Sequence, residues 1–169
     1  MTELYLKNTG RFIFLVLFQV LILNHVDISG YVNPYFYIYF ILLLPFSTPK
    51  WLLLLLSFLI GFTIDLFTHT MGLNAAACVV MAFARPFVIA LISGGSDLTG
   101  DTPSIKYQDL KWFTNYAVIL VVLHHFTLFF LEIFRFSEFF STLLRVILSS
   151  IFTLLLIYIS EYLFYPRKK

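Results

Sequence analysis

Charge is the scarcest property of this chain. Charged residues make up 12% of its 169 positions, whereas soluble domains carry about 25%. Hydrophobic residues reach 60%, against about 45–50% in soluble domains. The net charge of +2 is too small for a nucleic-acid-binding surface, and no basic patch is interleaved with aromatic residues. The composition predicts an integral membrane protein with no separate soluble domain and no nucleic-acid partner.

Cysteine and the common catalytic motifs are also missing. Cys78 is the only cysteine, which excludes an internal disulfide and a thiolate metal cluster. No Gly-x-Ser-x-Gly, His-Glu-x-x-His or phosphate-cradling glycine loop occurs. The adjacent His124 and His125 would point about 100° apart on a helix, which suits hydrogen bonds between helices better than one metal ion. We expect no cofactor, no metal and no enzymatic activity.

Six apolar segments predict the membrane crossings. They cover residues 11–26, 33–46, 50–68, 72–92, 112–133 and 139–165. A spanning helix needs about 20 residues, so the second segment is short. It could be tilted or re-entrant, and a count of five spans stays open. The expected fold is all-α: one membrane domain over residues 1–169, built as a compact bundle of about six transmembrane helices.

Positive charge predicts the orientation of this bundle. With six spans, the N-terminal tail, the turn 47–50, the loop 93–111 and the C-terminus share one face. That face carries Lys7, Arg11, Lys50, Lys106, Lys111, Arg167, Lys168 and Lys169, and the opposite face carries only Arg135. Loops rich in Lys and Arg stay in the cytoplasm, so both termini are expected there. Five spans would place the basic C-terminus outside, which favours six.

The loop 93–111 is rich in Gly, Ser and Asp. This composition predicts a flexible cytoplasmic loop. It could dock a cytoplasmic partner or simply connect two spans.

An acidic residue lies inside the third span. Asp65 follows Lys50 by fifteen residues, which is about 22 Å along a helix. A carboxylate in a span costs roughly 2.5–3.5 kcal/mol at the bilayer centre, so it is expected to face protein or water. Gly61 shares its helical face and would let a neighbouring helix approach. Asn74 returns to the same depth. A structural polar clamp is the first interpretation, and a ligand, ion or partner contact the alternative.

Two arginines in the spans have candidate partners at the same depth. Arg145 near the outer start of the last span could pair with Asp65. Arg85, next to Pro86, could pair with Glu161. Either arginine could instead extend toward lipid headgroups.

Together these features resemble MreD, the rod shape-determining membrane protein family. The resemblance covers essentially the whole chain and rests on the six-span layout and on local motifs: Gly61-x-x-x-Asp65, Gly72-x-x-Ala75, Arg85-Pro86, His124-His125 and Phe130-Leu131-Glu132-x-Phe134.

The resemblance implies a fold similar to the substrate-capture (S-component) subunits of vitamin transporters. It implies a non-catalytic scaffold in the bacterial inner membrane, part of the cell-elongation machinery that makes peptidoglycan and maintains rod shape. The main partner would be MreC, with MreB, RodA and a transpeptidase in the same complex and membrane lipids around it. Small residues would offer the MreC helix a lipid-facing groove: Gly61, Gly72, Ala75 and Ala76.

Two rival functions remain open. One is the capture subunit of a vitamin or metal transporter, with a polar cavity near Asp65, Asn74 and Tyr31–Tyr39. The other is an intramembrane enzyme in which Asp65, His69, His124 or His125 acts as acid or base.

Overall fold

The computed structural model describes residues 2–25, 33–95, 98–133 and 139–164. Within these ranges the regular structure is entirely helical, which confirms the all-α prediction. The elements are α1 (Thr2–Leu21), η1 (Leu23–His25), η2 (Phe36–Ile38), α2 (Tyr39–Leu42), α3 (Lys50–Thr68), α4 (Leu73–Ser93), α5 (Leu110–Ile133) and α6 (Phe139–Phe164).

Five of these helices are long and apolar enough to cross a membrane: α1, α3, α4, α5 and α6. Large apolar side chains also cover their outer faces. On α4, for example, Phe83, Phe87 and Leu91 are all more than 60% exposed. Exposed apolar surface of this extent is unfavourable in water and matches contact with lipid. The structure therefore supports a multi-pass membrane protein.

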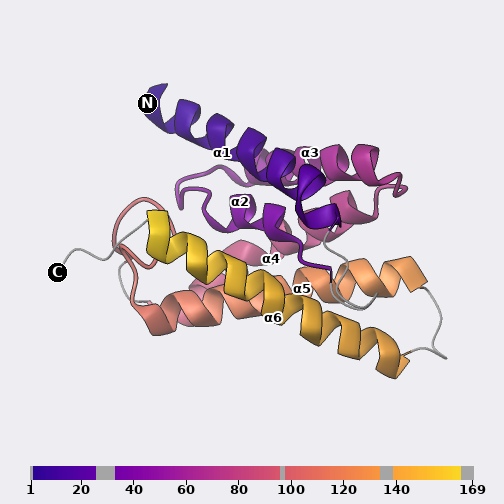
Figure 1. Ribbon diagram of the computed structural model, residues 1–169. Helices are drawn as coiled ribbons and strands as arrows, with labels where there is room; N and C mark the ends of the chain where they lie inside the picture. Colours follow the sequence, from indigo (N-terminus) through magenta and orange to yellow (C-terminus); the bar gives the residue numbers. More distant parts are fainter. Residues whose placement is uncertain (1, 26–32, 96–97, 134–138, 165–169) are drawn as a thin grey trace.

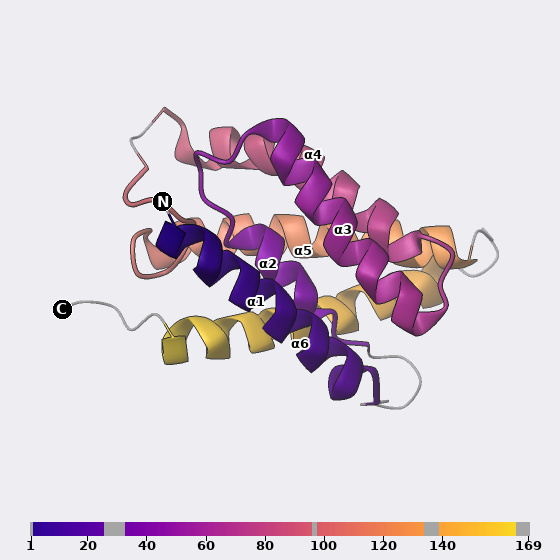
Figure 2. The ribbon, with the colours of Figure 1, turned by 90° about the horizontal axis from the view of Figure 1, so that it is seen from above.

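The expected second span, residues 33–46, is not a membrane-length helix. It contains only η2 and α2, which together cover Phe36–Leu42. Pro34 and Pro45 flank ten residues, about half the length that a spanning helix needs. The segment nevertheless runs back through the bundle, from the end of α1 toward the start of α3 (Figures 1 and 2). In the part of the chain that the structure describes, five long helices and one short, irregular segment thus cross the bundle.

This short crossing lies inside the bundle. Every residue from Phe36 to Leu44 is at most 5% exposed. It packs against α1, α3 and α6. Backbone that is not in a continuous helix is tolerated at membrane depth only where protein covers it. The irregular segment is therefore the centre of the core and does not face lipid.

The closest helix contact joins α3 and α4. These helices are connected by a tight turn in which His69 and Gly72 have left-handed backbone conformations, with φ of 56° and 83°. A Cβ atom added to Gly61 would lie 2.6 Å from the Cα of Ala75. Glycine at position 61 is what lets the two backbones approach this closely.

The loop between α4 and α5 is more ordered than its composition predicted. Pro103, Ser104 and Ile105 are buried, and the amide of Phe46 donates to the carbonyl of Asp101 at 2.9 Å. Gln108 Nε2 donates to the carbonyl of Thr99 at 2.6 Å. The described part of this loop folds against the end of the bundle where α1 begins and α6 ends (Figures 1 and 2).

Candidate functional site

The polar side chains of the interior surround the irregular crossing 33–46. At its start, Gln19 of α1 uses both ends of its amide. Gln19 Oε1 accepts from the amides of Phe36 at 2.9 Å and Tyr37 at 3.4 Å, and Nε2 donates to the carbonyl of Pro34 at 2.9 Å. Gln19 is only 2% exposed. One glutamine thus satisfies three backbone groups that have no helical partner.

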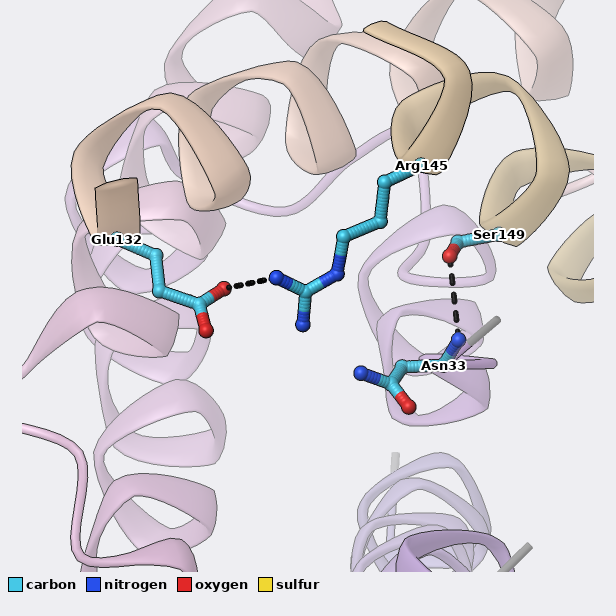
Figure 3. Close-up of polar contacts among 4 residues, drawn as sticks. All are labelled: Asn33, Glu132, Arg145 and Ser149. Carbon is cyan, nitrogen blue, oxygen red and sulfur yellow. Dashed lines mark hydrogen bonds and ion pairs between the residues drawn. The ribbon is translucent and has the colours of Figure 1, made fainter. Parts of the chain in front are cut away.

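Helix α6 supplies two hydroxyl groups to the same segment. The amide of Asn33 donates to Ser149 Oγ at 3.2 Å (Figure 3), and the amide of Tyr35 donates to Thr153 Oγ1 at 3.1 Å. Ser149 and Thr153 are one turn apart, so both face the crossing. These bonds fix the extended residues 33–35 along α6.

At its other end the crossing presents carbonyl oxygens, because α2 ends at Leu42 and its last carbonyls lack helical donors. Tyr116 Oη donates to the carbonyl of Leu42 at 2.9 Å. Arg85 Nη2 donates to the carbonyl of Leu44, and its Nε donates to Tyr116 Oη at 2.7 Å. Arg11 Nη1 lies 3.4 Å from the carbonyl of Leu43. Arg85 therefore binds the carbonyl of Leu44 directly and supports the bond of Tyr116 to the carbonyl of Leu42.

The candidate pair of Arg85 with Glu161 does not form. Glu161 of α6 instead binds the loop that precedes α5. Its Oε2 accepts from Ser104 Oγ at 2.9 Å and from the amide of Ile105 at 2.8 Å, while Oε1 accepts from Tyr39 Oη at 2.6 Å. This buried carboxylate joins α6, α2 and the loop, which explains the unexpected order of the loop.

Asp65 caps the start of α4 from the end of α3. Its Oδ1 accepts from the amide and the Nδ2 of Asn74, both at 3.0 Å, and from Thr70 Oγ1. Its Oδ2 accepts from the amide of Ala75 at 2.9 Å. The first amides of a helix have no internal acceptor and carry a partial positive charge. A carboxylate at this position accepts hydrogen bonds from these amides and offsets their partial positive charge.

Asn74 extends this cap into the core. Its Oδ1 accepts from Tyr37 Oη at 2.8 Å. Tyr37 Oη has one proton, which it gives to Asn74, so the contact of 3.2 Å with His124 Nε2 requires the imidazole to donate. His124 is then the Nε2–H tautomer. A continuous chain of bonds runs from Asp65 to His124.

His125 takes the opposite tautomer. Its Nδ1 lies 2.8 Å from the carbonyl of Val121, which can only accept, so Nδ1 carries the proton. Its Nε2 then accepts from Thr153 Oγ1 at 3.2 Å. The two neighbouring histidines thus bond to different elements, the crossing and α6.

Arg145 does not meet Asp65. It forms an ion pair with Glu132 of α5, with Nη1 3.2 Å from Oε2 (Figure 3), and its guanidinium carbon lies 4.3 Å from the centre of the Phe129 ring. Glu132 and Arg145 lie near the facing ends of α5 and α6, which makes this pairing the local one. Asp65 has its donors in the cap of α4.

The small residues expected to form one groove divide between two roles. A groove of about 630 Å³ lies along α3 and α4, lined among others by Gly72, Ala75 and Ala76. Gly61 is not among the lining residues, because it is buried against the backbone of α4. The prediction that Gly61 lines the lipid-facing groove was therefore wrong, because Gly61 contacts α4 instead.

Several important side chains were not singled out from the sequence, among them Gln19, Ser104, Tyr116, Ser149 and Thr153. A single glutamine within the apolar run 11–26 and the i, i+4 hydroxyls of Ser149 and Thr153 were the available signals. Among the described residues, no group of three or more His, Cys, Asp and Glu side chains is arranged to hold a metal ion. The polar atoms described above bond mostly to one another and to the backbone, which is a structural arrangement.

Comparison of the chain with protein-family models, with curated proteins and with solved structures gives no match in any of the three. The fold and the site define the class of an all-helical, multi-pass membrane protein whose core is a buried broken segment held by side-chain bonds.

Proposed function

We propose that this chain is a non-catalytic scaffold of the MreD type, which binds MreC and positions it within the cell-elongation machinery. The observation that carries the proposal is the groove along α3 and α4, in which Gly72, Ala75 and Ala76 lie among larger apolar side chains beside a capped helix start. The interior polar groups also agree with a non-catalytic scaffold, because they hydrogen-bond to one another within the chain: Asp65, Asn74, Tyr37 and His124.

The groove has room for part of one transmembrane helix, about one and a half turns, because one turn of an α-helix fills roughly 420 Å³ and the groove measures about 630 Å³. Phe58 and Phe62, whose ring centres lie 5.6 Å apart, form one wall. Ala76 is half-buried in the lining. Small residues allow close packing of helix backbones, which drives association in lipid.

The proposed orientation places the Lys-rich end in the cytoplasm of the bacterial cell. In the structure Lys7 and Arg11 lie in the first half of α1, and Lys50 is the first residue of α3. Lys106 belongs to the loop before α5 and Lys111 to the first turn of α5. The opposite end holds the Asp65 cap. Partners on the cytoplasmic side would include MreB, and RodA and the transpeptidase would join through the complex.

The test is co-purification of tagged MreC from membranes that contain Ala76→Leu or Ala90→Leu. Both substitutions are on α4 and have the same chemistry, but Ala90 is exposed outside the groove. We expect Ala76→Leu to reduce recovered MreC at least tenfold and Ala90→Leu to leave it unchanged. Equal recovery with both variants, at equal protein levels, would refute the groove.

The same purification separates the scaffold from the rival transporter function. A capture subunit would bring down a coupling membrane protein with paired ATPases and retain a small molecule. Recovery of that set in place of MreC would replace the scaffold proposal.

A further inference from the structure

Asp65 caps α4 and also lines the groove along α3 and α4. Three N–H groups point at its carboxylate: the amide and the Nδ2 of Asn74, and the amide of Ala75. An N–H group can only donate, so both carboxylate oxygens act as acceptors, which is the pattern of an ionised carboxylate. The fourth donor, Thr70 Oγ1, is neutral as well. The bonds of the cap therefore leave the negative charge of Asp65 in place.

The surroundings of Asp65 offset only part of this charge. The described residues that line the groove include no lysine, arginine or histidine. Arg145, the cation expected at the same depth, pairs with Glu132 instead. The start of α4 supplies roughly half a positive unit charge, as helix N-termini do. A partial negative charge thus stays in a groove whose other lining residues are uncharged.

One carboxylate oxygen of Asp65 also keeps capacity for a further donor. Oδ1 accepts from three groups, whereas Oδ2 accepts, within the described part of the chain, from the amide of Ala75 alone. Each oxygen of an ionised carboxylate has about two acceptor sites. Ala75 lines the groove and Asn74 does not, so Oδ2 is the oxygen on the groove side.

The groove runs from Asp65 toward the middle of the two helices. On α3 its lining reaches Phe58, seven residues or about 10 Å from Asp65. Met71, in the turn between α3 and α4, is 100% exposed and forms the rim at the other end. This rim belongs to the end of the bundle that is extracytoplasmic in the proposed orientation. A helix in the groove would therefore pack its apolar turns below Asp65 and bring its outer end to Asp65.

We propose that the transmembrane helix in this groove carries a lysine or arginine at its outer end, which pairs with Asp65. The inference rests on the proposed scaffold function and specifies the chemistry of the partner. A basic side chain supplies both the positive charge and the donor for Oδ2, whereas a serine or threonine would supply the donor alone. Lysine and arginine are enriched on the cytoplasmic side of membrane proteins, so a basic residue at the outer end distinguishes this partner helix.

The test is titration of the full chain with purified MreC in a mild detergent. Met71→Lys adds a positive charge at the rim and should weaken binding about fivefold, the size of a strong exposed ion pair. Met71→Glu should strengthen binding, and Met71→Gln, which changes the side chain without adding charge, should leave it unchanged. High salt should remove the difference between Met71→Lys and Met71→Glu, because exposed charges are screened.

A second position and the partner itself provide the controls. Phe140, at the start of α6, is 83% exposed and lies outside the groove. Phe140→Lys therefore adds the same charge at the same end of the bundle and should not change binding. Replacing the lysine or arginine at the outer end of the MreC helix by glutamine should abolish the difference between Met71→Lys and Met71→Glu.

The outcomes separate this inference from the scaffold function. Equal binding by Met71→Lys and Met71→Glu, with Ala76→Leu still weakening it, would overturn the basic residue and leave the scaffold standing. No binding of MreC by the unmodified chain would overturn both. A charge effect that persists after the glutamine replacement in MreC would assign the cation to another source, such as a lipid amine, and would also overturn the proposal.

Discussion

At the scale of single residues, the buried carboxylates differ in what they hold. Asp65 accepts from Thr70, Asn74 and Ala75 and so fixes the start of α4. Glu161 accepts from Tyr39, Ser104 and Ile105 and so fixes a loop. Each carboxylate is surrounded by donors, which is the condition for burying it in a membrane protein. Their removal should therefore have separate, local consequences.

Asp65→Asn should destabilise the protein by about 1–3 kcal/mol, because the new amide can keep its oxygen toward Asn74 but turns an NH₂ group toward the amide of Ala75. The measurement is unfolding in mixed micelles, followed by helix content. Asp101→Asn, at an exposed acid, is the matched control and should change little. An equal loss in the two variants would contradict the capping role.

Two glycine substitutions should act in opposite directions. Gly61→Ala places a Cβ 2.6 Å from the Cα of Ala75, where backbone atoms cannot easily move, so we expect a loss of about 1–3 kcal/mol. Gly10→Ala meets no neighbour and should gain up to about 1 kcal/mol from helix propensity. The same unfolding assay in lipid-free detergent measures both. A stable Gly61→Ala variant would show that α3 and α4 pack less closely than described.

At the scale of elements, the loop between α4 and α5 is held by a helix that follows it in the chain. Ser104 and Ile105 contact Glu161 near the end of α6. Because the loop and α6 lie at the same end of the bundle, the loop closes that end of the core. The hydrogen-exchange rates of the loop amides should therefore depend on the contact with Glu161.

Glu161→Ala should expose the amide of Ile105. Loss of a buried acceptor is worth about 1–3 kcal/mol, which corresponds to roughly 5- to 150-fold faster hydrogen exchange at this amide. Glu161→Gln should have a smaller effect, since its oxygen can face Ile105 and its NH₂ group can face Tyr39. Glu132→Ala, at the far end of α5, is the control. Unchanged exchange in Glu161→Ala would mean that the loop is held by other contacts.

At the scale of the whole molecule, the six passages of the chain put α1's first turn and α6's last turn at the same end (Figures 1 and 2). Five long helices alone would have put them at opposite ends. The short crossing brings the number of passages to six, and an even number returns the end of α6 to the side where α1 begins. The topology that positive charge predicted is thus compatible with only five membrane-length helices.

Cysteine labelling tests this topology. Cys78 is fully buried, so the natural chain should react with a membrane-impermeant maleimide only after denaturation. Lys50→Cys and Met71→Cys introduce exposed sites at the two ends of α3. In intact cells we expect labelling of Met71→Cys alone, and in inverted vesicles labelling of Lys50→Cys alone. The reverse pattern would invert the proposed orientation.

The long helices were predictable because each is a local property of an apolar run. The proximity of Asp65 and Asn74 was also foreseeable, since only a tight turn separates their helices. The bonds of Arg85 to the carbonyl of Leu44 and of Glu161 to Ile105 were not. The first depends on where the irregular crossing leaves an unpaired carbonyl, and the second on where the loop before α5 leaves an unpaired amide. No local periodicity encodes either position.

The broken crossing also sets the order in which the chain can mature during synthesis. The amides of Asn33 and Tyr35 find their acceptors 116 and 118 residues further along, on α6. When a ribosome has made only the first half of the protein, those acceptors do not yet exist. The early segment must wait beside the translocon, or at the membrane surface, until the last helix arrives. A chain stopped before α6 would therefore leave the amides of Asn33 and Tyr35 without these acceptors.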